Sequence, residues 1–299
     1  MERREFLKKS AQIGCGAVLL SSPLFSLAGN SLPDAVWVTN GKPGDLVDTA
    51  LMELGGISRF VKKNDIVAIK PNIGWDRAPE YAANTNPAVV AAVVKACFEA
   101  GAKKVKVFDR TCNNPLRCYR NSQIEKAAKS LGAEVLQVHD HQFVKKALPR
   151  GQILKEWPIH KEYLEADVRI NIPIAKHHSL GVITAGLKNL MGVMGDNRGS
   201  IHNHFEQKLC DITRHILPEL TIIDAYRILL RNGPRGGNLE DVALKKTLIA
   251  SHCTVTADFL TAELFNLTPE KVPHVSTAYR NGLSKTDPNK AKVKRISLS

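Results

Sequence analysis

Short apolar runs rich in valine and isoleucine alternate along the chain with longer segments whose apolar residues recur at helical spacing. The apolar runs are typical of strands buried on both faces of a sheet. The longer segments are typical of the helices that cover such a sheet. The pattern therefore predicts an α/β fold with a mainly parallel sheet and helices on both faces. Strands are expected over 35–38, 66–70, 104–108, 134–138, 168–172, 220–223, 247–250 and 293–298.

Capping residues define one helix particularly well. Asn86 can accept a hydrogen bond from the first turn, Pro87 suits the first helical position, and Gly101 suits the residue after the last turn. A helix is therefore predicted over 87–100. Further helices are expected over 121–131, 257–266 and 269–282.

Residues 1–28 have the layout of a twin-arginine export signal. Arg3-Arg4 is followed by Phe6-Leu7-Lys8, and an apolar stretch over 11–27 leads to a small-x-small site at which signal peptidase would cut after Ala28. We expect a single α/β domain over 29–299 in the periplasm, with the Tat translocase and signal peptidase as partners during export. No stable membrane span is expected after processing. A permanent anchor or an amphipathic helix is the alternative, which the short, Gly- and Ser-rich stretch disfavours.

The charge of the chain points to anionic partners. The formal net charge is +13, and the signal contributes four basic and two acidic residues, so the remainder keeps +11. Nucleic acid is not expected as the partner, because aromatic residues make up only 6% and do not interleave with basic ones. An anionic small molecule is the expected partner, with a solvated basic surface as the alternative.

The cysteines give no metal-cluster signature. Five remain after residue 28, and no pair has Cys-x-x-Cys spacing, so an iron–sulfur cluster is not expected. Cys112 and Cys118 flank a loop-like run. A disulfide between them after export and two reduced thiols both stay open.

Ionisable or amide side chains directly follow five of the predicted strands. The carboxyl ends of parallel strands meet at one edge of a sheet, where ligands bind, so these side chains are candidates for one site. Chance polarity at strand ends explains one or two of these cases more easily than five. The groups are Lys70 with Asn72, Asp109, His139 with His141, Lys176 to His178, and Asp224.

The densest candidates lie between residues 176 and 198. A helix over 182–190 would place Thr184 and Lys188, four residues apart, on one face. A helix start beside basic groups favours an anion site. A glycine-rich packing helix with solvated ends is the alternative. The candidate substrate-binding residues are Lys70, Asn72, Thr184, Lys188, Asn189 and Arg198.

Histidines raise the question of a divalent metal. His202 and His204 would point the same way in an extended segment, and with His177, or with His139 and His141, they offer imidazole nitrogens to a metal. No His-x-x-x-His pair marks a helical metal site, so chance proximity is the alternative. His177 and His202 are the candidate metal ligands, and the cofactor stays open.

These motifs, in this order, resemble the family known as domain of unknown function 362, over roughly residues 64–283. Family members usually have Lys-x-His in the middle motif, so within Lys176-His177-His178 it is His178 that matches the family histidine. Where relatives have Asp-Pro-Val before a helix, this chain has Cys253-Thr254-Val255, which leaves Asp258 as the nearest matching acid. Many members carry a twin-arginine signal, and some append a cysteine-rich ferredoxin-like segment that is missing here. The matching residues are 70–72, 85–87, 101–102, 176–178, 184–192, 204, 223–225 and 233–234.

Two functions remain in competition. The first is an enzyme acting on an anionic carboxylate or phosphate, with His178, Lys176, His204 and Asp224 as catalytic residues, Asp224 orienting a histidine that moves a proton. The second is a non-catalytic periplasmic protein that binds or delivers an anion or metal. Signatures of serine hydrolases, P-loop NTPases and dinucleotide-binding proteins are missing from the sequence.

Overall fold

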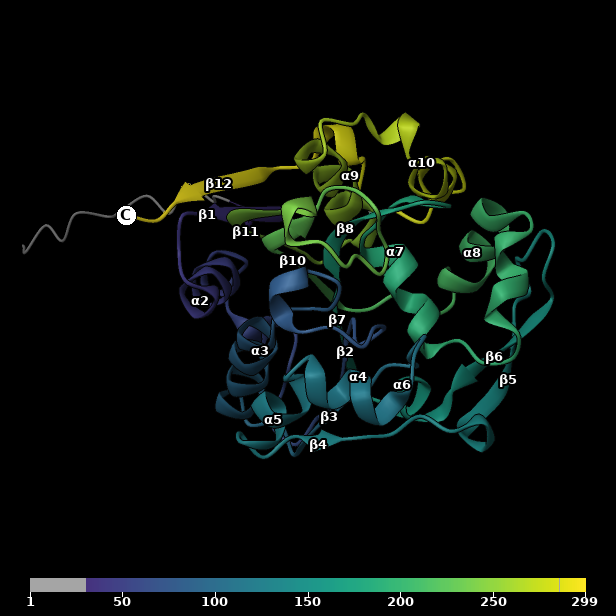
Figure 1. Cartoon of the computed structure of the whole chain (residues 1–299), viewed down its shortest axis with the longest axis horizontal. Helices are drawn as coiled ribbons and strands as arrows, with labels where there is room; N and C mark the ends of the chain where they lie inside the picture. The colour runs from purple at the N-terminus through teal and green to yellow at the C-terminus, as the bar shows by residue number, and fades with distance from the viewer. Residues whose placement is uncertain (1–30, 285) are drawn as a thin grey trace, which may run out of the picture. The chain divides into compact units, whose positions relative to one another are not determined.

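A ten-stranded, mostly parallel sheet forms the centre of the computed structural model, which describes residues 31–284 and 286–299 (Figure 1). Eight strands follow the order β12-β1-β11-β10-β7-β2-β3-β4, while β8 pairs with β10 and β9. The predicted α/β class is confirmed. The strands of this sheet are β1 (Ala35–Thr39), β2 (Ile66–Pro71), β3 (Lys104–Val107), β4 (Glu134–Val135), β7 (Val168–Ile172), β8 (Ile174–His178), β9 (Val182–Thr184), β10 (Leu220–Leu229), β11 (Val242–Ser251) and β12 (Val293–Ser297).

The remaining elements are a two-stranded sheet and the helices. The small sheet pairs β5 (Phe143–Ala147) with β6 (Glu156–His160) in antiparallel fashion. The helices are α2 (Pro43–Glu53), α3 (Pro87–Glu99), α4 (Pro115–Asn121), α5 (Ile124–Lys129), α6 (Lys161–Glu165), α7 (Gly186–Asn189), α8 (Phe205–Thr213), α9 (Thr254–Leu264) and α10 (Pro273–Arg280). Residues Leu32–Ser299 form one compact unit. The predicted export signal lies outside the described residues.

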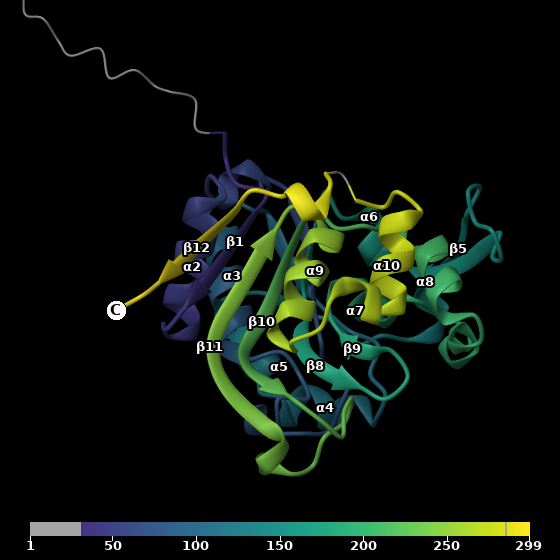
Figure 2. The ribbon, with the colours of Figure 1, turned by 90° about the horizontal axis from the view of Figure 1, so that it is seen from above.

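Helices cover both faces of the sheet. Ile222 of β10 packs in the core that contains residues of α2, α3 and α5, whereas its neighbour Ile223 packs in a core with Ala257 of α9. Successive side chains of a strand point to opposite faces, so one strand serves both cores. Figure 2 shows α9 running beside the long strands β10 and β11. None of the helices within the described part of the chain is long and apolar enough to cross a membrane.

Helix α3 begins and ends near the expected residues. The Asn86 side chain accepts a hydrogen bond from the Ala88 N–H at 3.0 Å, and Gly101 adopts a φ of +90° just after the helix. The helix predicted over 121–131 is present but shorter: it is α5, which begins only at Ile124, because Gln123 before it adopts a left-handed φ of 62°. Helix α4, which precedes Gln123, was not predicted.

The segment that follows β7 differs most from the expectation. Lys176, His177 and His178 do not leave a strand but lie inside β8, which continues beyond Pro173 and pairs with β10. The helix expected over 182–190 begins only at Gly186, because Val182–Thr184 forms β9 antiparallel to β8. In this register Lys176 lies opposite Thr184, and His178 lies opposite Val182.

Candidate active site

A pocket of about 750 Å³ lies where the carboxyl ends of β2 and β3 meet β8, β9 and α7. The edge of the sheet beyond parallel strand ends is where α/β folds bind ligands. The loop over 109–112 and the turns that follow α7 complete its wall. Nine predicted site residues line it: Lys70, Asn72, Lys176, His178, Thr184, Lys188, Asn189, Arg198 and His202.

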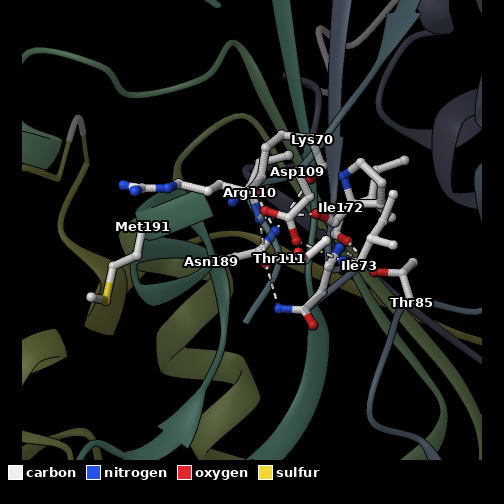
Figure 3. A network of polar contacts seen from close by, with 12 residues as sticks. Lys70, Ile73, Thr85, Asp109, Arg110, Thr111, Ile172, Asn189 and Met191 are labelled. Carbon is white, nitrogen blue, oxygen red and sulfur yellow. Dashed lines mark hydrogen bonds and ion pairs between the residues drawn. The ribbon is translucent and has the colours of Figure 1, made fainter. Parts of the chain in front are cut away.

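A buried ion pair forms the floor of this pocket (Figure 3). Nζ of Lys70 lies 2.9 Å from Oδ1 of Asp109, with both side chains at most 3% exposed. The same ammonium donates to the Pro71 carbonyl at 2.9 Å and to Oδ1 of Asn189 at 3.0 Å. Burial lowers the pKa of Lys70, and the Asp109 carboxylate offsets part of that shift. Because its ammonium donates to two protein oxygens and its charge is paired with Asp109, Lys70 supports the pocket rather than a ligand.

Asn189 connects the ends of two strands, β2 and β7, through the oxygen and the nitrogen of its amide. Its Oδ1 also accepts from Nδ2 of Asn72 at 2.9 Å, and its Nδ2 donates to Oδ1 of Asn171 at 2.8 Å and to the Lys70 carbonyl at 3.2 Å. The amide is therefore saturated by protein partners. Asn189 fixes α7 against β2 and β7, which makes it a positioning residue.

Gly192 allows the ion pair to approach the turn after α7. A Cβ at this position would lie 1.7 Å from Oδ1 of Asp109 and 2.5 Å from Nζ of Lys70. These distances leave no room for any side chain. The glycine is therefore required by close approach.

Lys176 projects from β8 into the pocket and is only 1% exposed. Its Nζ donates to Oδ1 of Asn72 at 3.1 Å and to the Ala83 carbonyl, and lies 6.0 Å from the centre of the Trp75 ring. Burial lowers the pKa of Lys176 to about 7. Its amine can therefore take up and release a proton near neutral pH.

Lys188 projects from α7 and is 7% exposed. Its Nζ lies 3.5 Å from Sδ of Met191 and 4.9 Å from the centre of the Phe205 ring. Burial lowers its pKa to about 8. Among the residues that the structure describes, neither Lys176 nor Lys188 forms an ion pair with a carboxylate.

Arg198 joins two walls of the pocket. Its guanidinium donates to the Arg110 carbonyl at 2.8 Å and to the Thr111 carbonyl at 2.9 Å. These bonds hold the loop after β3 against the turns after α7. The guanidinium adds a further positive charge that faces the same cavity.

Two histidines stack at one side of the pocket. The rings of His178 and His202 have centroids 6.3 Å apart and an interplanar angle of 18°, and the Phe205 ring also stacks on His202, at 5.3 Å. Burial and the neighbouring Lys188 charge lower the pKa of His178 to about 2, so this ring is neutral.

Three predicted residues lie elsewhere. The Asp224 carboxylate accepts from the Asn86 N–H at 2.7 Å and the Tyr226 N–H at 3.0 Å, and burial raises its pKa to about 6. His204 lies in a separate hollow before α8. His177 points to the opposite face of β8 from its neighbours, as strand alternation requires, and accepts from the Gly233 N–H at 3.1 Å. The structure thus does not place Asp224 where it could orient His178.

Two of the candidate histidines, His177 and His178, do not fit a metal site. Nδ1 of His177 and Nδ1 of His178 both accept hydrogen bonds from backbone N–H groups, so each ring carries its proton on Nε2. A ligating histidine instead donates from the nitrogen that does not bind metal. Over residues 31–284 and 286–299, no group of three His, Cys, Asp or Glu is placed to hold a metal ion. Asp258, the acid nearest the family motif, accepts from the Gly186 and Leu187 N–H groups and anchors the start of α7.

Cys112 and Cys118 are both thiols in the structure and do not form a disulfide. Cys112 is exposed and lines the pocket, whereas Cys118 is buried behind it.

Comparison with known proteins decides the family. Residues 67–263 match the model described as a domain of unknown function (DUF362), which is more than half of the chain. The chain belongs to the DUF362 family. It is 29% identical over 246 residues to a thylakoid-associated protein of Synechocystis sp., which is 80% of this chain and 74% of that protein.

Two solved structures resemble part of this DUF362 chain at 12% identity. One is a protein of Thermotoga maritima, with a TM-score of 0.46 over 76% of this chain and 60% of that one. The other is the lactate racemase apoprotein of Thermoanaerobacterium thermosaccharolyticum, with a TM-score of 0.47 over 78% of this chain and 57% of that one. This chain therefore spans less than two thirds of either protein.

Several DUF362 pocket residues were missed as site candidates from sequence. Trp75, Cys112 and Met191 line the cavity, and Phe205 packs against Lys188 and His202. Apolar and thiol side chains give no local signal of a site. Asp109 was noted at a strand end, but its ion pair with Lys70 depends on β2 and β3 being neighbours.

Proposed function

We propose that the pocket binds a small anionic molecule, a carboxylate or a phosphate, and that the protein is an enzyme acting on it. The observation that carries this proposal is the burial of the Lys176 and Lys188 ammonium groups, at 1% and 7% exposure, without a carboxylate partner among the described residues. A buried charge without a counter-charge is costly in a folded protein. An anionic ligand would supply the missing charge.

The arrangement of the cations supports specific roles. Nζ of Lys188 contacts the Met191 thioether and the Phe205 ring, and no carboxylate among the described residues pairs with it, so it is the amine most available to a ligand oxygen. Arg198, which lines the same cavity, would add a second contact. A cavity of about 750 Å³ suits a small metabolite.

An enzyme is favoured over simple capture by the state of Lys176. An amine whose pKa has fallen to about 7 can act as a base or nucleophile at neutral pH, and perturbed pKa values cluster at catalytic sites. A binding or delivery protein needs the positive charges but not this shift. Turnover of a bound anion, lost in Lys176→Met without loss of binding, would separate the two functions.

We propose that this chemistry takes place in the periplasm. The support is the twin-arginine pattern and cleavage site of residues 1–28. Twin-arginine export carries proteins that have already folded, so the pocket would form before translocation.

Thermal unfolding with a panel of anions tests the proposal. We expect phosphate or oxalate to raise the melting temperature above that in chloride at equal ionic strength, because a ligand that binds only the folded state stabilises it. Lys188→Met should abolish this rise. Lys95→Met is the matched control, since Lys95 is an exposed lysine on α3. A wild-type melting temperature that no anion raises would contradict the proposal.

A further inference from the structure

The hydrogen bonds of His178 fix which of its ring nitrogens carries the proton. Nδ1 lies 3.1 Å from the Leu180 backbone nitrogen and 3.2 Å from the Gly181 backbone nitrogen. A backbone N–H can only donate, so Nδ1 presents its lone pair to both groups. The neutral ring must therefore carry its proton on Nε2, which makes that atom a donor.

The partner of His202 fixes the opposite tautomer. Its Nδ1 lies 3.3 Å from the Gly199 carbonyl oxygen. A carbonyl oxygen can only accept, so Nδ1 carries the proton, and Nε2 of the neutral ring keeps a lone pair. A backbone carbonyl that binds one nitrogen in this way commonly orients a histidine whose other nitrogen does chemistry.

These two rings line the same cavity and stack almost in parallel, with centroids 6.3 Å apart. Phe205 stacks on the His202 ring, and His178 is held by its position in β8. One cavity wall thus presents a hydrogen-bond donor beside a proton acceptor. Burial, and after it the Lys188 charge, lowers the pKa of both rings, which favours their neutral forms.

We propose that His178 and His202 form a donor–acceptor pair that moves a proton on the bound anion. Nε2–H of His178 would donate to a carbonyl oxygen of the anion, and Nε2 of His202 would accept the proton from the adjacent carbon. This inference rests on the proposed function and names its substrate class as an anionic carbonyl compound. Its carboxylate or phosphate would lie against Lys188 and Arg198.

The proton transfer balances without a further reactant. Nε2 of His202 takes the proton from the carbon next to the carbonyl, and the C–H electron pair forms a carbon–carbon double bond. The carbonyl π electrons move to oxygen, and the resulting oxyanion accepts the Nε2–H bond of His178. Return of the proton to carbon completes an isomerisation or exchange. A neutral imidazole can act as such a donor.

The tautomers can be read directly in the full-length protein. Long-range ¹H–¹⁵N NMR correlations distinguish a protonated ring nitrogen from one with a lone pair. We expect His178 to be protonated on Nε2 and His202 on Nδ1, with His178→Gln and His202→Gln used to assign the signals. Identical tautomers in the two rings would overturn the inference.

Oxalate, a planar dianion with adjacent oxygens, probes the ligand side. At concentrations that raise the melting temperature, we expect it to shift the Nε2–H signal of His178 downfield. An unchanged signal at those concentrations would also overturn the inference. A melting temperature that no anion raises would instead count against the proposed function. The tautomers measured in the unliganded protein would still show whether His178 and His202 form a donor–acceptor pair.

Discussion

The Lys70 ammonium and the Asp109 carboxylate lie 2.9 Å apart at the floor of the pocket, and both are almost fully buried. Removing one charge leaves the other buried and uncompensated. Asp109→Asn should therefore destabilise the protein by about 3–5 kcal/mol in urea unfolding.

An exposed pair offers the matched control for that change. Glu99→Gln breaks the solvent-exposed pair with Lys95, which is 3.6 Å long, and should cost about 0–1 kcal/mol. Equal costs for Asp109→Asn and Glu99→Gln would show that the buried pair has no special structural role.

Gly192→Ala should disrupt this floor by steric conflict. The new Cβ would overlap Oδ1 of Asp109, so the ion pair or the turn after α7 must move, at a cost of about 1–3 kcal/mol. Gly44→Ala in α2 is the control, because nothing lies within 4 Å of its added Cβ. Urea unfolding compares the two. A Gly192→Ala variant as stable as Gly44→Ala would be inconsistent with the observed packing.

Lys176 should make the stability of the protein depend on pH in a defined direction. Its pKa is about 7 when folded, against 10.5 as the ordinary value. Below pH 7 both states hold the proton, and the folded state bears the full cost of the buried charge. Between pH 7 and about 10 only the unfolded state holds it, so that cost falls by about 1.4 kcal/mol per pH unit.

Comparison with Lys176→Met isolates this contribution. The free energy of unfolding of wild type minus that of Lys176→Met should rise between pH 7 and 10. The same difference measured with Lys95→Met should stay nearly flat, because Lys95 is exposed. A flat difference for Lys176→Met would mean that this amine titrates as an ordinary lysine.

The strand and helix pattern could be predicted from sequence because local rules decide it. Valine-rich runs became β1, β2, β3 and β7, and Asn86 caps α3 as expected. Strand β8 was missed because Lys176 to His178 are polar, which usually indicates a loop, and because Pro173 interrupts the run. These polar strand residues are stable here because two of them face a pocket rather than an apolar core.

The membership of the site could be predicted only in part. Lys176, His178, Lys188 and Arg198 meet at one cavity because the carboxyl ends of the strands converge there. The partners of Asp224 could not be foreseen, because the Asn86 N–H that it binds lies 138 residues away in sequence. Histidine tautomers likewise depend on backbone groups whose placement no local pattern gives.

Export can be tested without changing charge. Replacing both arginines by lysine, Arg3→Lys with Arg4→Lys, should leave the protein unprocessed in the cytoplasmic fraction, because the twin-arginine signal is read as a specific address. Lys8→Arg with Lys9→Arg is the control and should be exported. Cell fractionation and the size of the product measure both. Unimpaired export of the double lysine variant would argue against this route.

The reactivity of the Cys112 thiol can report the positive charge of the pocket. Cys112 is exposed and lines the cavity, whereas the other four described cysteines are buried. Anionic iodoacetate and neutral iodoacetamide therefore report, by mass spectrometry of the Cys112 peptide, whether the cavity attracts anions. We predict that the ratio of the iodoacetate rate to the iodoacetamide rate exceeds the ratio for glutathione, and that phosphate or Lys188→Met reduces it. A ratio equal to that of glutathione, unaffected by phosphate, would contradict an anion-binding pocket.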